Sequence, residues 1–436
     1  MDFNSSACIS GRDMKFLVEL TADVVEASRV PQGTKVLSYG PNSTGGTIIR
    51  PGGRGCYPAF WVRDYAMSLE TGMITLEEQE HALRLTAATQ QEGDWLTISG
   101  SCVPHGSIVD HVSLEGKAIF FPGTLDDYEN QGGIWGKRPS LDDHFYFIHM
   151  AWYLAVAAKK PEILSLEVGG RTILERLALA FAVPPSDSDT CLVRCDENTR
   201  GVSFGFVDAI MHTGKLLFCS LLKYRAAEEM AELFKLAGDD TNAARYVSVA
   251  ASLKRNINKV FPPDAGLPHA STGISAQGDV WGAAFGVYIG AFDGDATKKI
   301  CMTLRDSYLD GTLTYRGNVR HVRTCDDFNA ITAWERCVGE SMKNRYQNGA
   351  YWGTPVGWVC WAISQVDPAV AVRLAEEYIE ELREGDFRQG TDFGSPWECF
   401  HPDCGYRQNP VYMTSVSCPL AAFRKLWPYS NSRKSL

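Results

Sequence analysis

A short cluster of aromatic residues, glycine and an acid or amide recurs along this chain and constrains its fold most. The cluster occurs six times, at intervals of roughly 45 to 80 residues, and each copy stands just before an apolar run with helical spacing. A helix pair cannot bury its apolar faces alone, so a series of such units has to stack or close on itself. The clusters would then converge on one concave surface. They read FWVRDY (60–65), WGKRPSLDDH (135–144), FGFVDA (204–209), QGDVW (277–281), QNGAYWGT (347–354) and SPWECF (395–400).

Helical periodicity dominates the chain, and alternation typical of strands is rare. The pattern predicts about a dozen helices, among them 65–91 and 327–344. No Pro/Ser-rich linker divides the chain, so we expect one domain over 1–436. The predicted fold class is all-α, an (α/α)6 toroid of six hairpins with inner and outer helices. Two irregular segments interrupt it, a Gly-rich loop at 41–55 and an excursion at 94–124, and long loops of this kind tend to carry function.

Composition and charge argue against several classes of partner. The chain of 436 residues has a formal net charge of -10, and its Lys and Arg residues form no block. Nucleic-acid binding is therefore not expected, because phosphate neutralisation requires a clustered basic face. No apolar run approaches the roughly 18 residues that span a bilayer, so no membrane partner is expected either.

The expected location of the protein rests on its N-terminus and its cysteines. Residues 1–15 lack the basic segment and the continuous apolar stretch of a secretory signal. The 13 cysteines are odd in number, and many lie in apolar helix-like segments where they serve as small hydrophobic residues. The sequence thus indicates a reduced, cytoplasmic protein, although glycosylation sequons at Asn4 and Asn42 point the other way.

Carboxyl groups within the aromatic clusters suggest acid–base chemistry on a sugar. A glycosidic bond is hydrolysed without metal or cofactor when one carboxylic acid protonates the leaving oxygen and a second carboxylate activates water or attacks the sugar. The acids that lie among aromatic residues are Asp64, Asp142, Asp143, Asp208, Asp279, Asp392 and Glu398.

Two of these acids are the candidates for catalysis. Asp208 follows Phe206 and Val207, and burial there would raise its pKa and keep it protonated as a general acid. A helix N-cap is the alternative role for Asp208. Glu398 follows Trp397 and precedes a glycine-containing loop, where it would stay ionised beside water as a base. The alternative for Glu398 is an ordinary surface-loop carboxylate.

Residues for substrate binding are expected in the same clusters. Arg63 and Asp64 lie between Trp61 and Tyr65, which places hydrogen-bonding groups for sugar hydroxyls beside a stacking ring; an internal ion pair explains these residues equally well. The candidates for ring stacking are Trp61, Trp135, Trp352 and Trp397. Further candidates for hydroxyl contacts are Arg138, Asp142, Gln347 and Asn348. His105 and Lys215 would meet a substrate carboxylate if the sugar were a uronate.

Other enzyme classes lack their defining motifs. The sequence contains no Walker A motif, no G-x-G-x-x-G after a strand, no H-E-x-x-H and no G-x-S-x-G. Scattered histidines leave open a sugar epimerase or a uronate lyase, in which His or Tyr moves protons; they are His105, His111, His144 and His212. A carbohydrate-binding protein without turnover also remains open.

These motifs, in this order and spacing, resemble the six-hairpin glycosidases, the superfamily of (α/α)6 barrels that includes glucoamylases, trehalases and processing α-glucosidases. Residues 61–70 (WVRDYAMSLE) are similar to the sugar-binding motif in which Arg63 and Asp64 would hold hydroxyls of the terminal sugar. The resemblance places Asp208 at the position of the general acid and Glu398 at that of the general base. Glucoamylase itself has a Glu pair beside Trp at the acid position, and the lone Asp208 is more similar to the trehalase pattern.

The resemblance implies an exo-acting, inverting glycoside hydrolase that releases a terminal, α-linked, glucose-like sugar. The expected partner is an oligosaccharide or a small glycoside, and no cofactor or metal is expected. Inversion predicts a separation of roughly 6.5 to 9.5 Å between the two carboxyl groups, against about 5 to 5.5 Å in a retaining enzyme.

Overall fold

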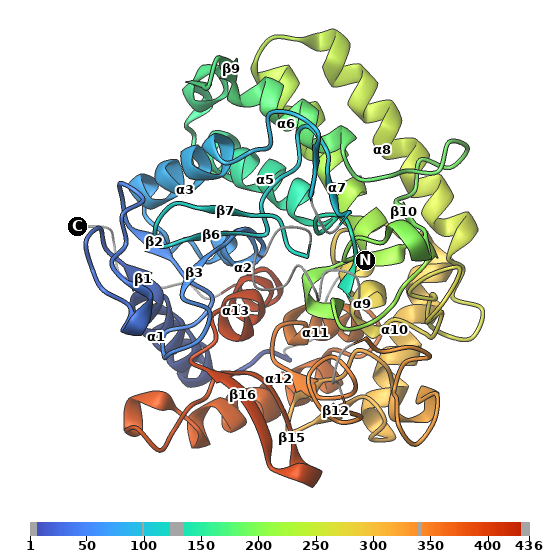
Figure 1. Cartoon of the computed structure of the whole chain (residues 1–436). Helices are drawn as coiled ribbons and strands as arrows, with labels where there is room; N and C mark the ends of the chain where they lie inside the picture. Colours follow the sequence, from blue (N-terminus) through green and yellow to red (C-terminus); the bar gives the residue numbers. More distant parts are fainter. Residues whose placement is uncertain (1–6, 98–99, 123–134, 339–341, 429–436) are drawn as a thin grey trace.

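Twelve α-helices in the described part of the chain form two concentric rings (Figure 1). The computed structural model describes residues 7–97, 100–122, 135–338 and 342–428. The inner ring consists of α2 (Val62–Ser68), α5 (Asp143–Trp152), α7 (Leu217–Leu236), α9 (Val280–Tyr288), α11 (Val356–Ser364) and α13 (Thr414–Leu426). The outer ring consists of α1 (Gly11–Ser28), α3 (Leu76–Ala88), α6 (Ile173–Ala182), α8 (Asp240–Val260), α10 (Gly294–Leu309) and α12 (Pro368–Glu384). Each inner helix contacts the next, and α13 contacts α2, so the ring closes.

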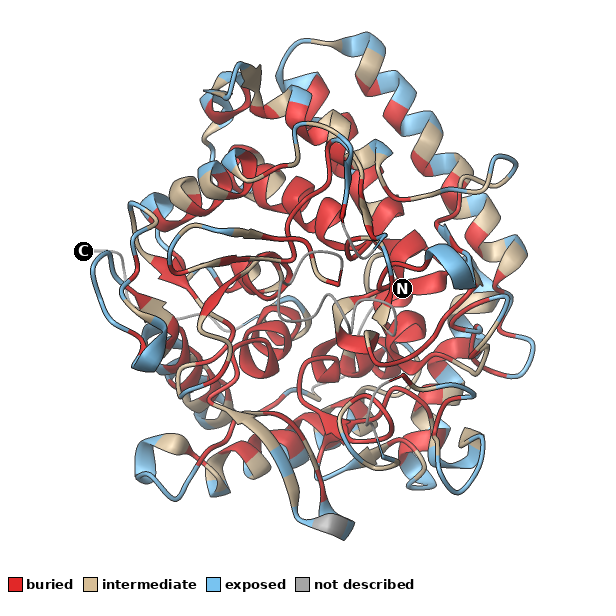
Figure 2. Cartoon of the chain, in the orientation of Figure 1, coloured by how far each residue is buried: buried red, intermediate tan, exposed pale blue. Residues whose placement is uncertain are grey.

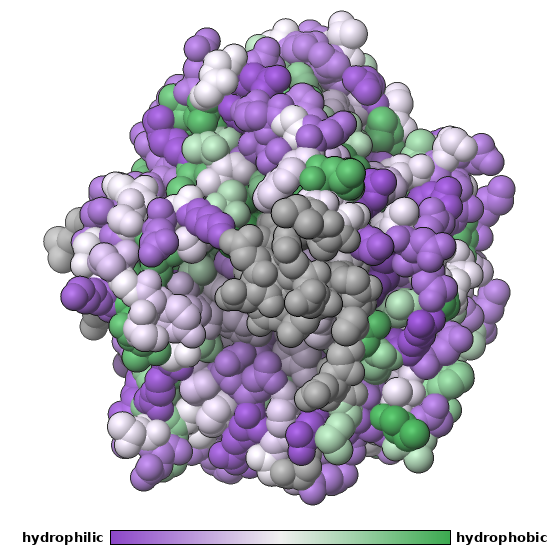
Figure 3. All heavy atoms as spheres, in the orientation of Figure 1, coloured by the Kyte–Doolittle hydropathy of each residue, from purple (hydrophilic) through white to green (hydrophobic). Residues whose placement is uncertain are grey.

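The distribution of apolar residues explains which helices are inner and which are outer. In α9 and α11 nearly every residue is buried, because neighbouring helices cover them on all sides. The outer helix α12 buries only a stripe with helical spacing, from Ala371 to Leu382, and exposes its charged face. Figure 2 shows this division between a buried inner ring and a partly exposed outer ring. Hydrophilic residues accordingly predominate on the face of the molecule that Figure 3 shows. The predicted (α/α)6 toroid is confirmed.

Two antiparallel sheets bring several of the sequence clusters together at one end of the ring. A five-stranded sheet has the order β12 (Thr314–Tyr315), β13 (Asn318–Val319), β14 (Tyr351–Trp352), β15 (Trp397–His401), β16 (Tyr406–Pro410). In a three-stranded sheet, β6 (His111–Ser113) lies between β3 (Ala59–Trp61) and β7 (Ala118–Ile119). The register pairs Trp61 with His111 and Trp352 with Cys399.

Four two-stranded ladders complete the strands of the described residues. They pair β1 (Arg29–Val30) with β2 (Ile48–Ile49), β4 (Trp95–Leu96) with β5 (Cys102–Val103), β8 (Glu167–Val168) with β9 (Arg171–Thr172), and β10 (Arg194–Cys195) with β11 (Gly214–Lys215).

Two helix predictions were wrong for local reasons. The predicted helix 65–91 is divided, because Gly72 adopts a left-handed conformation after the short turn η2 (Leu69–Thr71), and Thr75 then starts α3 with a capping box. The described part of 327–344 contains no helix. There the Asn329 side chain accepts hydrogen bonds from the amides of Ile331 and Thr332, a local alternative to helical bonding.

The structure also bears on the membrane prediction and on the two glycosylation sequons. Among the described helices, none has the length and apolar character required to cross a bilayer. Asn42 of the second sequon is fully buried and donates to the carbonyl groups of Val30 and Gly46, so it serves the loop as a structural residue. Asn4 lies outside the described residues.

Candidate active site

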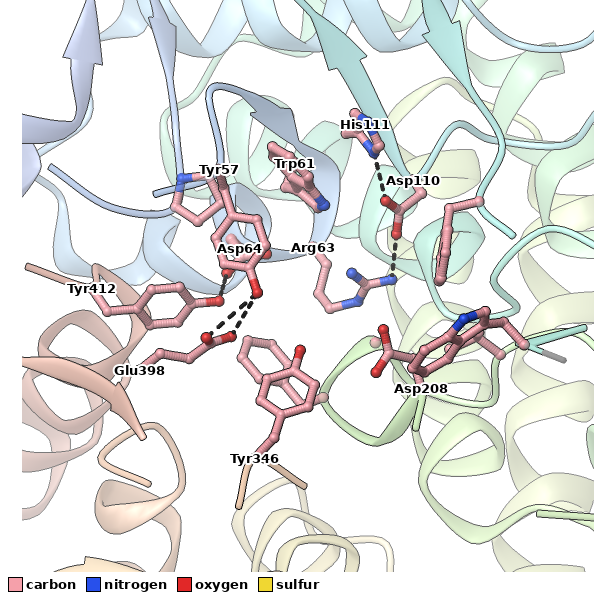
Figure 4. A pocket seen from close by; sticks show the side chains of 16 residues that line it. Tyr57, Trp61, Arg63, Asp64, Asp110, His111, Asp208, Tyr346, Glu398 and Tyr412 are labelled. Atoms are coloured by element: carbon pink, nitrogen blue, oxygen red, sulfur yellow. Dashed lines mark hydrogen bonds and ion pairs between the residues drawn. The ribbon is translucent and has the colours of Figure 1, made fainter. Parts of the chain in front are cut away.

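A cavity of about 250 Å³ opens where the aromatic clusters meet. Its aromatic walls come from Tyr57, Trp61, Phe121, Trp135, Phe206, Tyr346 and Tyr412. Its ionisable groups come from Arg63, Asp64, Asp110, His111, Asp208 and Glu398 (Figure 4). Both predicted catalytic carboxyl groups therefore border one space, as do Trp61, Trp135, Arg63 and Asp64.

Asp208 lies directly after the short turn η7 (Gly205–Val207), and its side chain borders the cavity. It caps no helix, because the next helix, α7, begins after Leu216. Burial raises the pKa of Asp208 to about 7, and a hydrogen bond from Gln347 and the charge of Arg63 partly oppose this effect. One carboxyl oxygen has no hydrogen-bond partner among the described residues. Asp208 is thus a carboxyl group that can hold a proton near neutral pH and can offer it to a ligand.

Glu398 lies in β15 and reaches the cavity from the C-terminal part of the chain. Its side chain accepts hydrogen bonds from the Tyr57 hydroxyl, at 3.2 and 3.4 Å, and from Asn409 Nδ2 at 2.7 Å. These donors favour the carboxylate, but burial prevails and raises the pKa of Glu398 to about 8. The expectation of a group ionised beside water was therefore wrong, because Glu398 is buried and only 2% exposed.

The two carboxyl groups lie on opposite sides of the cavity, and Tyr346 lies between them in the view of Figure 4. Tyr57 and Tyr346 both adopt a left-handed backbone conformation, with φ of 43° and 45°. Non-glycine residues rarely do so, and such strain concentrates at functional sites. A third tyrosine, Tyr412, donates its hydroxyl to Asp64 at 2.6 Å.

Arg63 is the centre of a buried ion-pair network. Its guanidinium group lies 2.6 Å from Asp142, 3.0 Å from Asp143 and 3.2 Å from Asp110. Asp142 also accepts a hydrogen bond from the Gly205 amide at 3.1 Å, which links this network to the Asp208 loop. Arg63 therefore forms the internal ion pair that was one of its two predicted roles, and it also borders the cavity. Asp142 itself supports Arg63 and does not border the cavity.

The four predicted stacking residues have different locations. Trp61 borders the cavity but already stacks on His111, with 4.2 Å between ring centroids. Trp135 borders the cavity beside Phe121. Trp352 is fully buried among aromatic rings, and Trp397 lies under the guanidinium group of Arg407, outside the cavity lining.

The remaining predicted contacts also lie outside the cavity lining. Gln347 and Asn348 are fully buried and hydrogen-bond to neighbouring loops. Arg138 lies in a separate hollow, and Lys215 lies 3.7 Å from Asp187. His105 is exposed and does not border the cavity, so neither His105 nor Lys215 is placed to meet a substrate carboxylate there.

Several residues of the lining were missed as sugar contacts, among them Tyr57, Asp110, His111, Tyr346 and Tyr412. Asp110 and His111 lie in the irregular segment 94–124, whose interruption of the helical pattern was the available signal. His111 Nδ1 lies 2.7 Å from Asp110. Among the residues that the structure describes, no three His, Cys, Asp or Glu side chains are grouped to hold a metal ion.

Comparison of the sequence with known protein families and with curated proteins finds no match. Comparison of structures does find matches. A rhamnosidase from Klebsiella oxytoca with rhamnose bound aligns with a TM-score of 0.57 at 13% identity, over 98% of this chain and 66% of the rhamnosidase. A GH63 mannosylglycerate hydrolase from Thermus thermophilus in complex with Tris aligns with a TM-score of 0.53 at 14% identity, over 94% of this chain and 100% of the other.

A third structure, described as a wild-type glycosidase, aligns with a TM-score of 0.54 at 12% identity, over 96% of this chain and 100% of the other. At such identities the likeness concerns the fold. The closed double ring of helices and these structural matches together show that the chain shares the fold of these proteins.

Proposed function

We propose that this protein is an exo-acting, inverting glycoside hydrolase, with Asp208 as general acid and Glu398 as general base. The observation that carries the proposal is the location of two buried carboxyl groups on opposite sides of one aromatic cavity. Inverting and retaining glycosidases both use two carboxyl groups that flank the scissile bond, so this arrangement supports hydrolysis, and the inverting outcome is taken from the family resemblance. The fold shared with glycosidases supports the same reaction class.

In the proposed reaction Asp208 gives its proton to the glycosidic oxygen as the bond from that oxygen to the anomeric carbon breaks. Glu398 takes a proton from a water molecule, whose oxygen bonds to the anomeric carbon from the opposite face. Tyr57 and Asn409 donate hydrogen bonds to Glu398, so they orient its carboxylate and stabilise its charge. The aromatic rings would stack on the sugar and exclude bulk water.

The proposed substrate is an oligosaccharide or small glycoside whose terminal sugar is uncharged, α-linked and glucose-like. A cavity of about 250 Å³ is small beside the roughly 300 to 1,000 Å³ typical of sites for drug-sized ligands, so it suits a single ring. Of the described residues that border it, Arg63 is the one guanidinium group, and three aspartates already surround it. A substrate carboxylate would find little compensating charge there.

A second candidate, a sugar epimerase or uronate lyase, is favoured by one observation. His111 and Tyr346 border the cavity, and either could move a proton to or from a sugar carbon. Incubation with disaccharides, free sugars and uronate polymers distinguishes the classes. Hydrolysis releases a reducing sugar, an epimerase converts a free sugar, and a lyase forms an unsaturated product that absorbs in the ultraviolet.

The central test replaces each carboxyl group by its amide. We expect Asp208→Asn and Glu398→Gln each to lower kcat by at least about a hundredfold on the substrate identified in that panel, because general acid–base catalysis is typically worth this factor. NMR of the first product formed by the unmodified protein reads the anomer directly.

The matched control is Asp403→Asn, which changes an acid with a 76% exposed side chain close to Glu398 in the sequence and should retain turnover. Near-normal turnover in either amide variant would remove that residue from its role, and a retained anomer would reject inversion.

A further inference from the structure

One buried side chain outside the cavity lining holds both ends of the loop that carries Asp208. Gln347 Oε1 accepts a hydrogen bond from the Ala209 amide at 2.6 Å, and Gln347 Nε2 donates to the Gly205 carbonyl at 3.1 Å. Gly205 and Ala209 stand on either side of Asp208 in the sequence. A single amide group therefore fixes the turn before the acid and the residue after it.

The same side chain also acts on the carboxyl group. A hydrogen bond from Gln347 stabilises the charged form of Asp208 and so opposes the rise in pKa that burial causes. Gln347 is itself held in place, because the Trp334 indole Nε1 donates to its backbone carbonyl at 3.3 Å. The preceding residue, Tyr346, borders the cavity between the two carboxyl groups.

We propose that Gln347 is a positioning residue for the general acid, which holds the Asp208 carboxyl group in the orientation required for proton transfer. The inference rests on the proposed hydrolase function and assigns Gln347 a role other than sugar binding. The contacts of Gln347 predict two separate effects of its removal. Loss of the side chain should misorient Asp208, which lowers kcat, and should remove a donor from the carboxylate, which raises the pKa of Asp208.

The sequence supplies a matched control in the next residue. Asn348 is also a fully buried amide, and its Oδ1 accepts from the Ala333 amide at 2.7 Å while its Nδ2 donates to the Ile331 carbonyl at 3.3 Å. Gln347→Leu and Asn348→Leu therefore both remove a buried amide that ties down a neighbouring loop. Only Gln347→Leu removes the contacts to the Asp208 loop.

We expect Gln347→Leu to lower kcat about tenfold to a hundredfold with KM within about twofold, because displacement of a catalytic group by about 1 Å has an effect of this size. We also expect the centre of its pH–rate profile to move to higher pH, since the acid keeps its proton longer. Asn348→Leu should leave that centre in place. Titration of the Asp208 carboxyl carbon by NMR, assigned with Asp208→Asn, checks the same shift without any turnover.

An unchanged kcat and pH profile in Gln347→Leu, or an equal shift in Asn348→Leu, would overturn the inference. If Gln347→Leu does not fold, Gln347→Glu keeps an acceptor for the Ala209 amide, removes the donor and adds a carboxylate. It too must raise the pKa of Asp208, and an unshifted titration contradicts the proposal. Failure of the hydrolase proposal gives a different result, namely no turnover by the unmodified protein.

Discussion

At the scale of single residues, burial sets the chemistry of the proposed catalytic pair. It raises the pKa of Asp208 to about 7 and that of Glu398 to about 8, despite the donors that each group receives. The reactive form requires a protonated Asp208 and an ionised Glu398. That form is most abundant between the two pKa values.

The pKa values predict a narrow, bell-shaped pH dependence of kcat/KM with its maximum between about pH 7 and 8. Below this range Glu398 is protonated and cannot accept a proton from water. Above it Asp208 is ionised and has no proton to give, so the rate falls on both sides. Initial rates in buffers of constant ionic strength, from acidic to alkaline pH, check this, and a maximum in clearly acidic buffer would contradict the assigned roles.

Gly205 is the residue whose small size matters most for the Arg63 network. A Cβ atom added there would stand 2.0 Å from Arg63 Cζ, far inside van der Waals contact. We expect Gly205→Ala to displace Arg63 or the Asp208 loop, to lower activity at least about tenfold, and to destabilise the fold by about 1 to 3 kcal/mol, the usual range for an overpacked core.

Thermal unfolding and steady-state rates measure both effects of Gly205→Ala. Gly294→Ala is the control, because a Cβ atom at Gly294, in the first turn of the outer helix α10, meets no atom within 4 Å. Wild-type activity in Gly205→Ala would show that Arg63 and the loop can adjust.

At the scale of elements, the sequence predicted where most inner helices begin but not which side chains at those points face the cavity. The clusters before α5, α7, α9, α11 and α13 were recognised because apolar runs with helical spacing follow them. Trp352 and Gln347 belong to the same cluster. Trp352 lies among aromatic rings of the core, whereas Gln347 lies against the loop that carries Asp208. Short irregular strands position these residues, and their register depends on partners distant in the sequence.

The missed residues have the same physical explanation. Tyr57 lies in a loop and Asp110 next to the short strand β6, where no periodic pattern indicates the direction of a side chain. Their location follows from long-range pairing, such as Trp61 with His111 in the three-stranded sheet. The sequence predicts a functional role for the irregular segment 94–124, but it does not show which side chains of the segment border the cavity.

The outer helices offer a prediction that separates stability from function. Thr75 begins α3 with a capping box, in which its side chain accepts from the Glu78 amide at 3.2 Å and Glu78 accepts from the Thr75 amide at 2.9 Å. We expect Thr75→Ala to lower the free energy of unfolding by about 1 kcal/mol and to leave turnover unchanged.

Denaturant unfolding and rate measurements check the Thr75 prediction. Thr172→Ala removes the equivalent capping box of α6, so it should also lower the free energy of unfolding and leave turnover unchanged. A large loss of turnover in either variant would mean that the outer ring influences the cavity.

At the scale of the whole molecule, the closed ring explains how distant clusters form one site. Asp208 comes from the middle of the chain, Trp61 and Arg63 from near its start, and Glu398 from near its end. The contact of α13 with α2 brings the last cluster beside the first. The repeat in the sequence predicted this convergence, because six hairpins that stack side by side have to bury their two end faces, and closure does so.

Ring closure also sets the moment at which activity can first arise during synthesis. The hydrogen bond of Tyr412 to Asp64 joins residues separated by 348 positions, and Tyr57 meets Glu398 across 341. A nascent chain that has left the ribosome only as far as α12 has its proposed proton donor but no base and no last inner helix. Under the proposed assignment of acid and base, catalysis therefore has to wait until α13 has emerged.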